Sequence, residues 1–141
     1  MRLVVDTSAL AALYIPEQLS GFIRRTIEES RELHFLDLAY YEFANVLRKR
    51  VGRGELGPAK AEEILREGLE LLSISVVHRA EEVVAEAYNI ALSHNITVYD
   101  AALIAVAEKI GGKVLTADLA LLRAVRGAPL SDLFQWPPIS I

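Results

Sequence analysis

Four carboxylate side chains stand at positions where a charge needs compensation. Asp100 is followed by seven apolar residues, which predict a helix that is apolar on every side and therefore buried. Glu42 lies between two aromatic residues on another mostly apolar segment, and Asp6 and Asp118 each follow a short β-prone run. An unpaired charge beside a buried element is costly, so these four acids are candidates for one shared site.

The chemistry of such a site would depend on how the charges are neutralised. Carboxylates that share a pocket repel each other unless they are protonated or bound to a cation. Mg²⁺ prefers oxygen ligands and is usually held by a few carboxylates together with substrate phosphates. A metal held in this way can activate water and stabilise the leaving oxygen when a phosphodiester is cleaved. The acids therefore predict an oxygen-only metal site in an enzyme of this kind.

Each acid also has a local explanation, which the sequence leaves open. Thr97 and Asp100 fit a capping box in which Asp replaces the usual Glu or Gln. Asp6 and Asp118 belong to a residue type that caps helix N-termini well. Glu42 can form a weak surface ion pair with a lysine two turns along its helix.

Other catalytic and metal-binding chemistries find little support. The chain has no cysteine, which excludes disulfides, thiolate metal sites and cysteine nucleophiles. Its three histidines do not have the spacing of metal ligands, which argues against zinc. No Ser-His-Asp set and no glycine-rich phosphate loop is present. Any metal should therefore be a hard cation bound by oxygen.

Size and composition indicate one globular domain over residues 1–141. Hydrophobic residues make up 52% of the chain, which argues against disorder. No apolar run is long enough to cross a bilayer, and Asp6 interrupts any signal-peptide pattern at the start. The chain is therefore expected to have no membrane association, and the absence of cysteine fits a cytoplasmic location.

The charge distribution gives a mixed indication about nucleic acid. The net charge of −4 counts mildly against a nucleic-acid binder. A local basic cluster nevertheless stands out, and it consists of Arg48, Lys49, Arg50 and Arg53. Such a cluster is most often a solvated face, but it can also bind phosphates. We therefore treat these four residues as candidate RNA-binding residues.

Short β-prone runs alternate with helical patterns along the chain. The strands are predicted over residues 2–5, 33–36, 73–77 and 113–116. The helices are predicted from residue 9 to 14, from Pro16 onward, and over 39–50, 58–72, 79–93, 98–110 and 119–125. This alternation predicts an open parallel sheet covered by helices on both faces. Ligands in such folds bind at the carboxyl ends of the strands, where the four acids should converge.

Four motifs, taken in order, resemble the signature series of PIN-domain nucleases. They are Val4-Val5-Asp6-Thr7-Ser8, Tyr41-Glu42-Phe43-Ala44-Asn45, Tyr99-Asp100-Ala101-Ala102 and Leu115-Thr116-Ala117-Asp118. Their order, spacing and the chain length are most similar to the compact VapC-type toxins of toxin–antitoxin pairs. The resemblance spans residues 3 to about 125.

The resemblance implies an α/β/α sandwich with a short, mainly parallel sheet and an endoribonuclease that depends on Mg²⁺ or Mn²⁺. It also implies a homodimer and an antitoxin partner that blocks the site. By resemblance, the catalytic and metal-binding residues would be Asp6, Glu42, Asp100 and Asp118. The supporting polar residues would be Thr7, Ser8, Asn45 and Thr116.

The sequence departs from the family pattern at one place. Some members carry a further acidic or polar residue soon after the last aspartate, where this chain has Ala120, Leu121 and Leu122. We therefore expect four carboxylates and not a fully occupied two-metal site.

Three other interpretations compete with the nuclease. The first is a phosphatase-like or receiver-like domain in which Asp6 accepts the phosphoryl group. Haloacid-dehalogenase-type enzymes have a second aspartate two residues after the first, and this chain has Ser8 there, which argues against that interpretation. A degenerate PIN-like module would only bind RNA or protein, although here all four acids are present. In the last interpretation the chain is a stable α/β domain with four helix caps.

Overall fold

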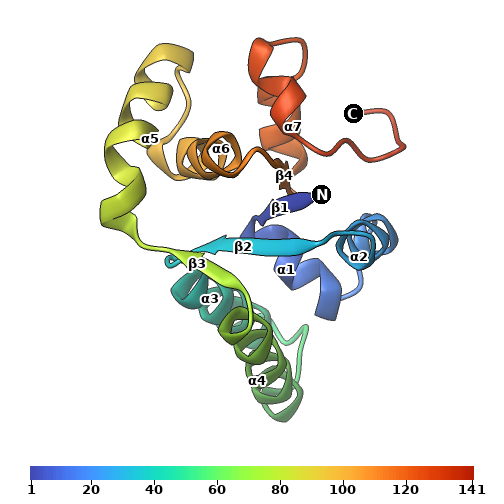
Figure 1. Ribbon diagram of the computed structural model, residues 1–141. Helices are drawn as coiled ribbons and strands as arrows, with labels where there is room; N and C mark the ends of the chain where they lie inside the picture. The colour runs from blue at the N-terminus through green and yellow to red at the C-terminus, as the bar shows by residue number, and fades with distance from the viewer.

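The centre of the computed structural model, which describes residues 1–141, is a parallel sheet of four short strands (Figure 1). The strands are β1 (Arg2–Val5), β2 (Glu32–Leu36), β3 (Val76–His78) and β4 (Lys113–Leu115), in the order β3-β2-β1-β4. Val4 of β1 lies opposite His34 of β2 and Val114 of β4. The expected parallel sheet is confirmed.

Helices connect the strands and cover both faces of the sheet. One layer is formed by α1 (Thr7–Tyr14), α2 (Ser20–Glu28), α3 (Ala39–Gly52) and α4 (Pro58–Ser73). The other is formed by α5 (Ala80–His94), α6 (Val98–Ile110) and α7 (Leu119–Val125), followed by the 3₁₀ helix η1 (Pro129–Leu133). Figure 1 shows the two layers above and below the strands, so the predicted α/β/α sandwich is confirmed.

The core is divided by the sheet because successive strand residues point to opposite faces. Leu3 and Val5 pack with Phe35 among the helices of the first layer. Val4 and Val114 pack with α6 in the second. Six residues of α6 are buried, as expected for a helix that is apolar on every side; they are Ala101, Leu103, Ile104, Ala105, Val106 and Ala107.

The beginning of the second helix differs from its prediction. Pro16 does not open a helix, and α2 begins four residues later at Ser20. The Glu17 carboxylate accepts a hydrogen bond from the Leu19 amide at 2.6 Å, and the Ser20 hydroxyl donates to the Ala12 carbonyl at 2.7 Å. These bonds hold residues 16–19 as a turn against the end of α1.

The strand order creates a crevice at the carboxyl edge of the sheet. The chain moves outward from β1 to β2 and β3, and then returns so that β4 pairs with the other side of β1. Ligands of open α/β sheets bind where the strand order reverses in this way. The residues that follow β1 and β4 therefore lie at the place where a functional site is expected.

No single helix is long and apolar enough to cross a membrane. Helices α5 and α6 would qualify together by length and composition, but they meet at an angle of 113°. Core helices of globular proteins pass the same test.

Candidate active site

Asp6 follows β1 and occupies the N-cap position of α1, but its side chain makes no capping hydrogen bond. One carboxylate oxygen, Oδ2, instead accepts hydrogen bonds from the hydroxyls of Ser8 at 3.0 Å and Thr116 at 2.7 Å. The capping explanation of Asp6 is therefore wrong for its side chain, which is directed to the residues that follow β4.

A hydroxyl network joins the ends of β1 and β4. The Ser8 and Thr116 oxygens lie 3.0 Å apart, and Ser8 Oγ also accepts from the Ala117 amide at 3.0 Å. Thr116 Oγ1 accepts from the Asp118 amide at 3.0 Å. Two segments that are more than one hundred residues apart in sequence are thus fixed beside the Asp6 carboxylate.

Glu42 is brought to the same edge by the first turn of α3. Its Oε1 atom accepts a hydrogen bond of 2.9 Å from the hydroxyl of Thr7, the first residue of α1. This bond links α1 to α3 and orients the carboxylate, and no lysine or arginine pairs with Glu42. The proposed Glu–Lys surface pair is therefore not formed.

At the start of α6, one half of the predicted capping box is present. The Thr97 hydroxyl accepts a hydrogen bond from the Asp100 amide at 3.1 Å, so Thr97 is the N-cap. The Asp100 carboxylate does not return a bond to the Thr97 amide. Burial raises the pKa of Asp100, the nearby Thr97 hydroxyl partly offsets this, and the charge of Asp118 adds to the increase.

Asp118 has a capping role and an electrostatic one. Its Oδ1 atom accepts hydrogen bonds from the amides of Ala120 at 3.0 Å and Leu121 at 3.2 Å, so the predicted N-cap of α7 is confirmed. Its charge also raises the pKa values of Asp6 and Asp100. Capping and membership of an acidic site are therefore compatible in this residue.

Asp6 shows the electrostatics of the site most clearly. Burial raises its pKa to about 6 from an ordinary value of 3.8, the two hydroxyls oppose this increase, and the charges of Glu42 and Asp118 add to it. Hydrogen bonds to a carboxylate favour its ionised form, whereas burial and like charges disfavour it. The four acids thus act on each other, which isolated helix caps would not do.

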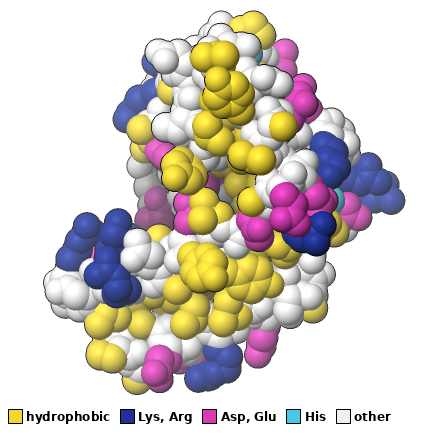
Figure 2. Space-filling view, turned by 90° about the vertical axis from the view of Figure 1, so that its left-hand side faces the viewer, with side chains coloured by type: hydrophobic (Ala, Val, Ile, Leu, Met, Phe, Trp, Pro, Cys, Tyr) yellow, Lys and Arg dark blue, Asp and Glu magenta, His cyan; other side chains and the backbone are white.

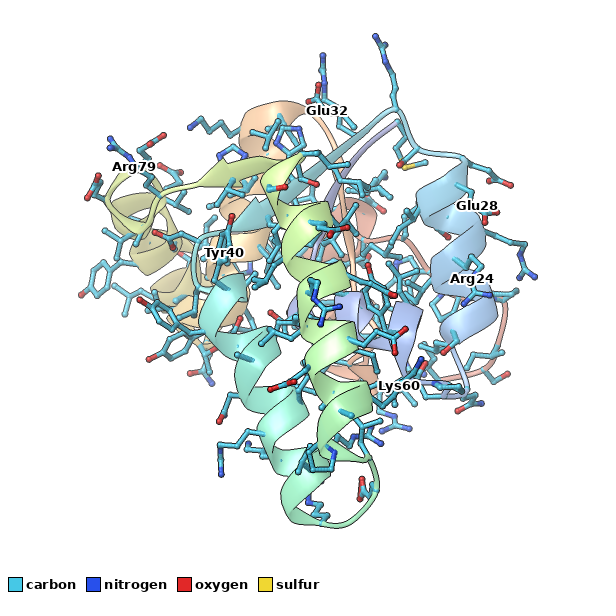
Figure 3. All side chains as sticks on the ribbon, turned by 90° about the horizontal axis from the view of Figure 1, so that it is seen from below. Arg24, Glu28, Glu32, Tyr40, Lys60 and Arg79 are labelled. Carbon is cyan, nitrogen blue, oxygen red and sulfur yellow. The ribbon has the colours of Figure 1, made fainter.

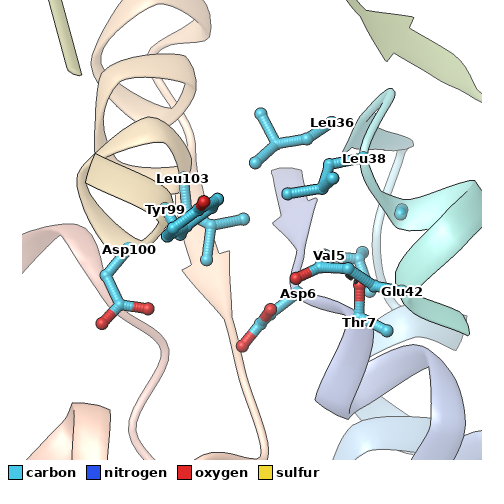
Figure 4. Close-up of a pocket in the computed structure, with 10 residues that line it drawn as sticks. Val5, Asp6, Thr7, Leu36, Leu38, Glu42, Tyr99, Asp100 and Leu103 are labelled. Atoms are coloured by element: carbon cyan, nitrogen blue, oxygen red, sulfur yellow. Dashed lines mark hydrogen bonds between the residues drawn. The ribbon is translucent and has the colours of Figure 1, made fainter. Parts of the chain in front are cut away.

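Three of the four acids line one small cavity of about 40 Å³. Figure 4 shows Asp6 between Asp100 on one side and Glu42 with Thr7 on the other. Apolar side chains form the opposite wall of this cavity; they are Leu36, Leu38, Tyr99 and Leu103. Asp118 does not line the cavity and stands beside it at the start of α7.

The donor chemistry of the site fits a hard divalent cation, because every candidate ligand is an oxygen and the net charge is strongly negative. In their present rotamers, however, no three Asp, Glu or His side chains of the molecule surround a single point at which a metal would bind. The fit therefore rests on donor type and electrostatics, and the side chains would have to reorient to share one ion.

The remaining predicted polar and basic residues lie outside the cavity. Asn45 is one turn beyond Glu42 on α3, where its side-chain oxygen accepts a 2.9 Å hydrogen bond from Arg48. Arg50 forms a 3.4 Å ion pair with Glu55. Lys49 and Arg53 are exposed. Asn45, Arg48 and Lys49 thus extend along α3 from the acids.

Sequence reasoning overlooked the apolar wall, and Tyr99 in particular. A signal for it was present, because an aromatic residue directly precedes two of the acids, in Tyr41-Glu42 and in Tyr99-Asp100. Both tyrosines are exposed, although their apolar neighbours in the sequence suggest a place in the core.

Comparisons with known proteins agree with the fold and the motifs. The model of the PIN domain matches residues 3–127. The chain is 51% identical to Ribonuclease VapC3 of Pyrobaculum aerophilum over 118 residues. This match covers 84% of this chain and 90% of that protein. It is 30% identical over 125 residues to Exonuclease VapC9 of the same organism, covering 89% and 86%.

A solved structure extends the likeness at the level of the fold. A toxin–antitoxin complex from Klebsiella pneumoniae contains a chain that superposes with a TM-score of 0.64 at 13% identity, covering 91% of this chain and 93% of that one.

Proposed function

The chain belongs to the PIN-domain family, and from that premise we propose that it is a metal-dependent endoribonuclease that acts as the toxin of a toxin–antitoxin pair. One observation carries the proposal: Asp6, Glu42 and Asp100 come from three separate segments and line one cavity at the carboxyl edge where the strand order reverses, and Asp118 stands beside it. The relative at 51% identity is named a ribonuclease, which supports RNA as the substrate.

The four carboxylates are the residues that would hold Mg²⁺ or Mn²⁺. When bound, the cation would supply charge neutralisation and activation of water for hydrolysis of a phosphodiester. The side chains around the acids then have definite tasks. Ser8 and Thr116 hold the Asp6 carboxylate in one orientation and favour its ionised form, and Thr7 does the same for Glu42.

The cleavage assay uses synthetic single-stranded RNA with Mg²⁺ or Mn²⁺ and with EDTA. We expect cleavage by the wild type with metal, none with EDTA, and a loss of at least about 100-fold in Asp100→Asn, as for removal of one electrostatic group from an active site. Asp132→Asn removes a charge from an exposed residue of η1 and is the matched control. Undiminished cleavage in EDTA would falsify the mechanism.

The mode of cleavage needs a separate substrate, because the second relative is named an exonuclease. A circular RNA has no ends, so only an endonuclease converts it to a linear product. We expect linear product from the wild type in the presence of metal. RNA binding without any cleavage would instead support the alternative of a PIN-like RNA- or protein-binding module.

Metal binding can be tested without the reaction. Millimolar Mg²⁺ or Mn²⁺ should raise the melting temperature of the wild type, since a ligand that binds only the folded state stabilises it. Asp100→Asn should gain much less from metal. In EDTA it should be at least as stable as the wild type, because the mutation removes a carboxylate whose pKa is raised by burial and by Asp118. Equal responses to metal would exclude Asp100 as a ligand.

We also propose a cytoplasmic location, a protein antitoxin that blocks the site, and a homodimer. The homodimer is supported by an exposed apolar stripe on α5, formed at helical spacing by Val84, Tyr88 and Leu92. Leu92→Glu should convert a dimer to a monomer in light scattering, whereas Ile74→Glu, at an even more exposed position, should not. Expression of the wild type without antitoxin should arrest growth, and Asp100→Asn should not.

A further inference from the structure

Exposed apolar side chains are concentrated on one side of the molecule. Seven of the twelve large exposed hydrophobic side chains belong to α5 or to the first turns of α3 and α6. Figure 2 shows hydrophobic side chains gathered on this face of the molecule. Contiguous patches of this kind usually mark a binding surface. The α5 stripe is assigned above to a second copy, which leaves the tyrosines of α3 and α6.

Tyr41 and Tyr99 are the most exposed of these tyrosines, at 79% and 68%. Each directly precedes a carboxylate of the candidate site, Glu42 and Asp100. Figure 3 marks Tyr40, the residue before Tyr41, at the N-terminal end of α3. Aromatic side chains are thus present at the first turn of both helices that carry an acid into the cavity.

The cavity has one acidic wall and one apolar wall. Tyr99 stands on the apolar wall with Leu36, Leu38 and Leu103, facing the side that carries Asp6 (Figure 4). A volume of about 40 Å³ accommodates water or an ion and not a nucleobase. A base of a bound nucleotide therefore has to lie on the exposed rim, where Tyr99 stands.

Two open hollows continue from this rim. One, of about 240 Å³, is lined by Tyr99 and Leu38 together with apolar residues of α5. Of the α5 stripe only Val84 borders this hollow, whereas Tyr88 and Leu92 lie outside it. The other, of about 570 Å³, is lined by Asp37, Leu38, Tyr40 and Tyr41. Leu38 borders the acidic cavity and both hollows, so the aromatic surface is continuous with the site.

The polar chemistry of this surface favours stacking over hydrogen-bonded reading of a base. No lysine or arginine lines the cavity or either hollow. The Asp37 carboxylate is already engaged, because it accepts a 3.0 Å hydrogen bond from the Ala80 amide at the start of α5. Aromatic side chains beside single-stranded nucleic acid bind bases through their π faces, with little dependence on base identity.

We propose that Tyr99 and Tyr41 are base-stacking residues that hold the nucleotides flanking the scissile phosphate of single-stranded RNA. Tyr99 stacks the base next to the acidic cavity, and Tyr41 a further base beside the larger hollow. The inference rests on the proposed ribonuclease function. It explains how a site lined by acids can retain an anionic substrate. It also requires that the RNA be unpaired at the site, since paired bases do not expose their faces.

The first experiment measures KM and kcat for a short synthetic single-stranded RNA with Tyr99→Leu and Tyr99→Phe. Leu keeps an apolar side chain, shorter than that of tyrosine and without a π face, whereas Phe keeps the ring. We expect Tyr99→Leu to raise KM about tenfold with little change in kcat, and Tyr99→Phe to behave as the wild type. Tyr41→Leu should show the same pattern. Ile74→Ala truncates an exposed apolar side chain that precedes β3, at the opposite edge of the sheet, and should change nothing.

A second measurement follows binding directly. In Tyr99→Trp, stacking of a base should quench the added indole fluorescence above the background of Trp136. An RNA with abasic positions should quench much less. If the wild type cleaves no RNA, the proposed function fails, yet base-dependent quenching would still support stacking at residue 99.

Three results would overturn the inference. One is a wild-type KM in Tyr99→Leu together with normal cleavage. Another is equal quenching by abasic and intact RNA. The third is a change of oligomeric state in Tyr99→Leu at assay concentrations, because Tyr99 would then be a contact to a second copy and not to RNA.

Discussion

The Asp6 carboxylate occupies a position where ionisation is unfavourable. Burial and the charges of Glu42 and Asp118 raise its pKa to about 6, and the hydroxyls of Ser8 and Thr116 offset only part of the increase. Such perturbed groups are typical of functional sites, where charge is kept for a ligand or a reaction at some expense of stability. Asp6 is therefore the residue whose titration should report most directly on the site.

The pH dependence of stability tests this account of Asp6. Its pKa is about 6 in the folded protein against 3.8 for the ordinary group, so the folded state binds the proton more tightly. Stability is therefore lost as pH rises from about 4 through 6, and the loss persists above that range. Asp6→Asn lacks this loss. Relative to the wild type, its free energy of unfolding should improve between pH 4 and 7, by at most about 3 kcal/mol.

The measurement is urea unfolding of both proteins in EDTA across this range. His78 contributes an opposite slope to both proteins, because burial lowers its pKa and stability is lost as pH falls below its ordinary value of 6.5. That contribution cancels in the difference. Parallel stability curves would mean that Asp6 is not perturbed in the way described.

At this scale the sequence predicted the types of residue better than their partners. The four acids and the hydroxyls of Thr7, Ser8 and Thr116 could be named as candidates because their motifs are short and local. The contact of His34 with His78, whose ring nitrogens lie 2.8 Å apart across β2 and β3, was not predicted. These residues are 44 positions apart, and only the strand order brings them together.

At the scale of elements, α3 must be held in place for Glu42 to reach Thr7. The packing of α3 on α4 is tight at one point, where Gly68 of α4 faces the ring of Phe43, the residue after Glu42. A Cβ atom at position 68 would lie 2.2 Å from that ring. Phe43 is fully buried, so neither the ring nor the helix has room to move freely.

Gly68→Ala should therefore destabilise the fold by about 1–3 kcal/mol, as overpacking of a core commonly does. It should also reduce activity, because a shift of α3 changes the distance from Glu42 to Thr7. Gly52→Ala, at the last residue of α3, is the matched control: its Cβ would meet nothing within 4 Å, so this variant should not destabilise the fold. Thermal melts of both variants check this, and an unchanged Gly68→Ala protein would contradict it.

The errors in the predicted elements have local causes that compete with the pattern used. The segment from Ser73 to Val77 looked like a strand, but α4 continues to Ser73 and β3 begins at Val76. The hydroxyls of Ser73 and Ser75 donate to carbonyls of α4 at 2.6 and 2.7 Å, so these residues prolong the helical turn. β-propensity alone did not reveal this.

At the scale of the molecule, the alternation of strands and helices predicted a parallel sheet but not the order of its strands. That order depends on which strand pairs with the second side of β1, and no local sequence pattern predicts this pairing. It is also what places Thr116 and Asp118 beside Asp6. The site is therefore a product of the topology as much as of its motifs.

The net charge of −4 raises the question of how the protein approaches RNA. Arg48 and Lys49 are exposed on α3, further along the helix than Glu42 and Asn45. Arg50 is partly neutralised by Glu55. Local positive surface can steer and hold phosphates even when the whole molecule is acidic. Arg48 and Lys49 are thus the members of the basic cluster best placed to bind the backbone.

Replacing both by glutamine should weaken RNA binding and make it less sensitive to salt. For single-stranded nucleic acid each lost phosphate contact reduces the slope of log K against log salt by about 0.7, so the double variant should lose about 1.4. Arg24→Gln with Arg25→Gln removes the same charge from neighbouring exposed residues of α2, although Arg24 also donates a 3.3 Å hydrogen bond to the Leu13 carbonyl. Fluorescence anisotropy across a salt series measures both. If the two double variants lose affinity and slope equally, net charge alone explains the effect, and the α3 cluster is a solvated face with no phosphate contacts of its own.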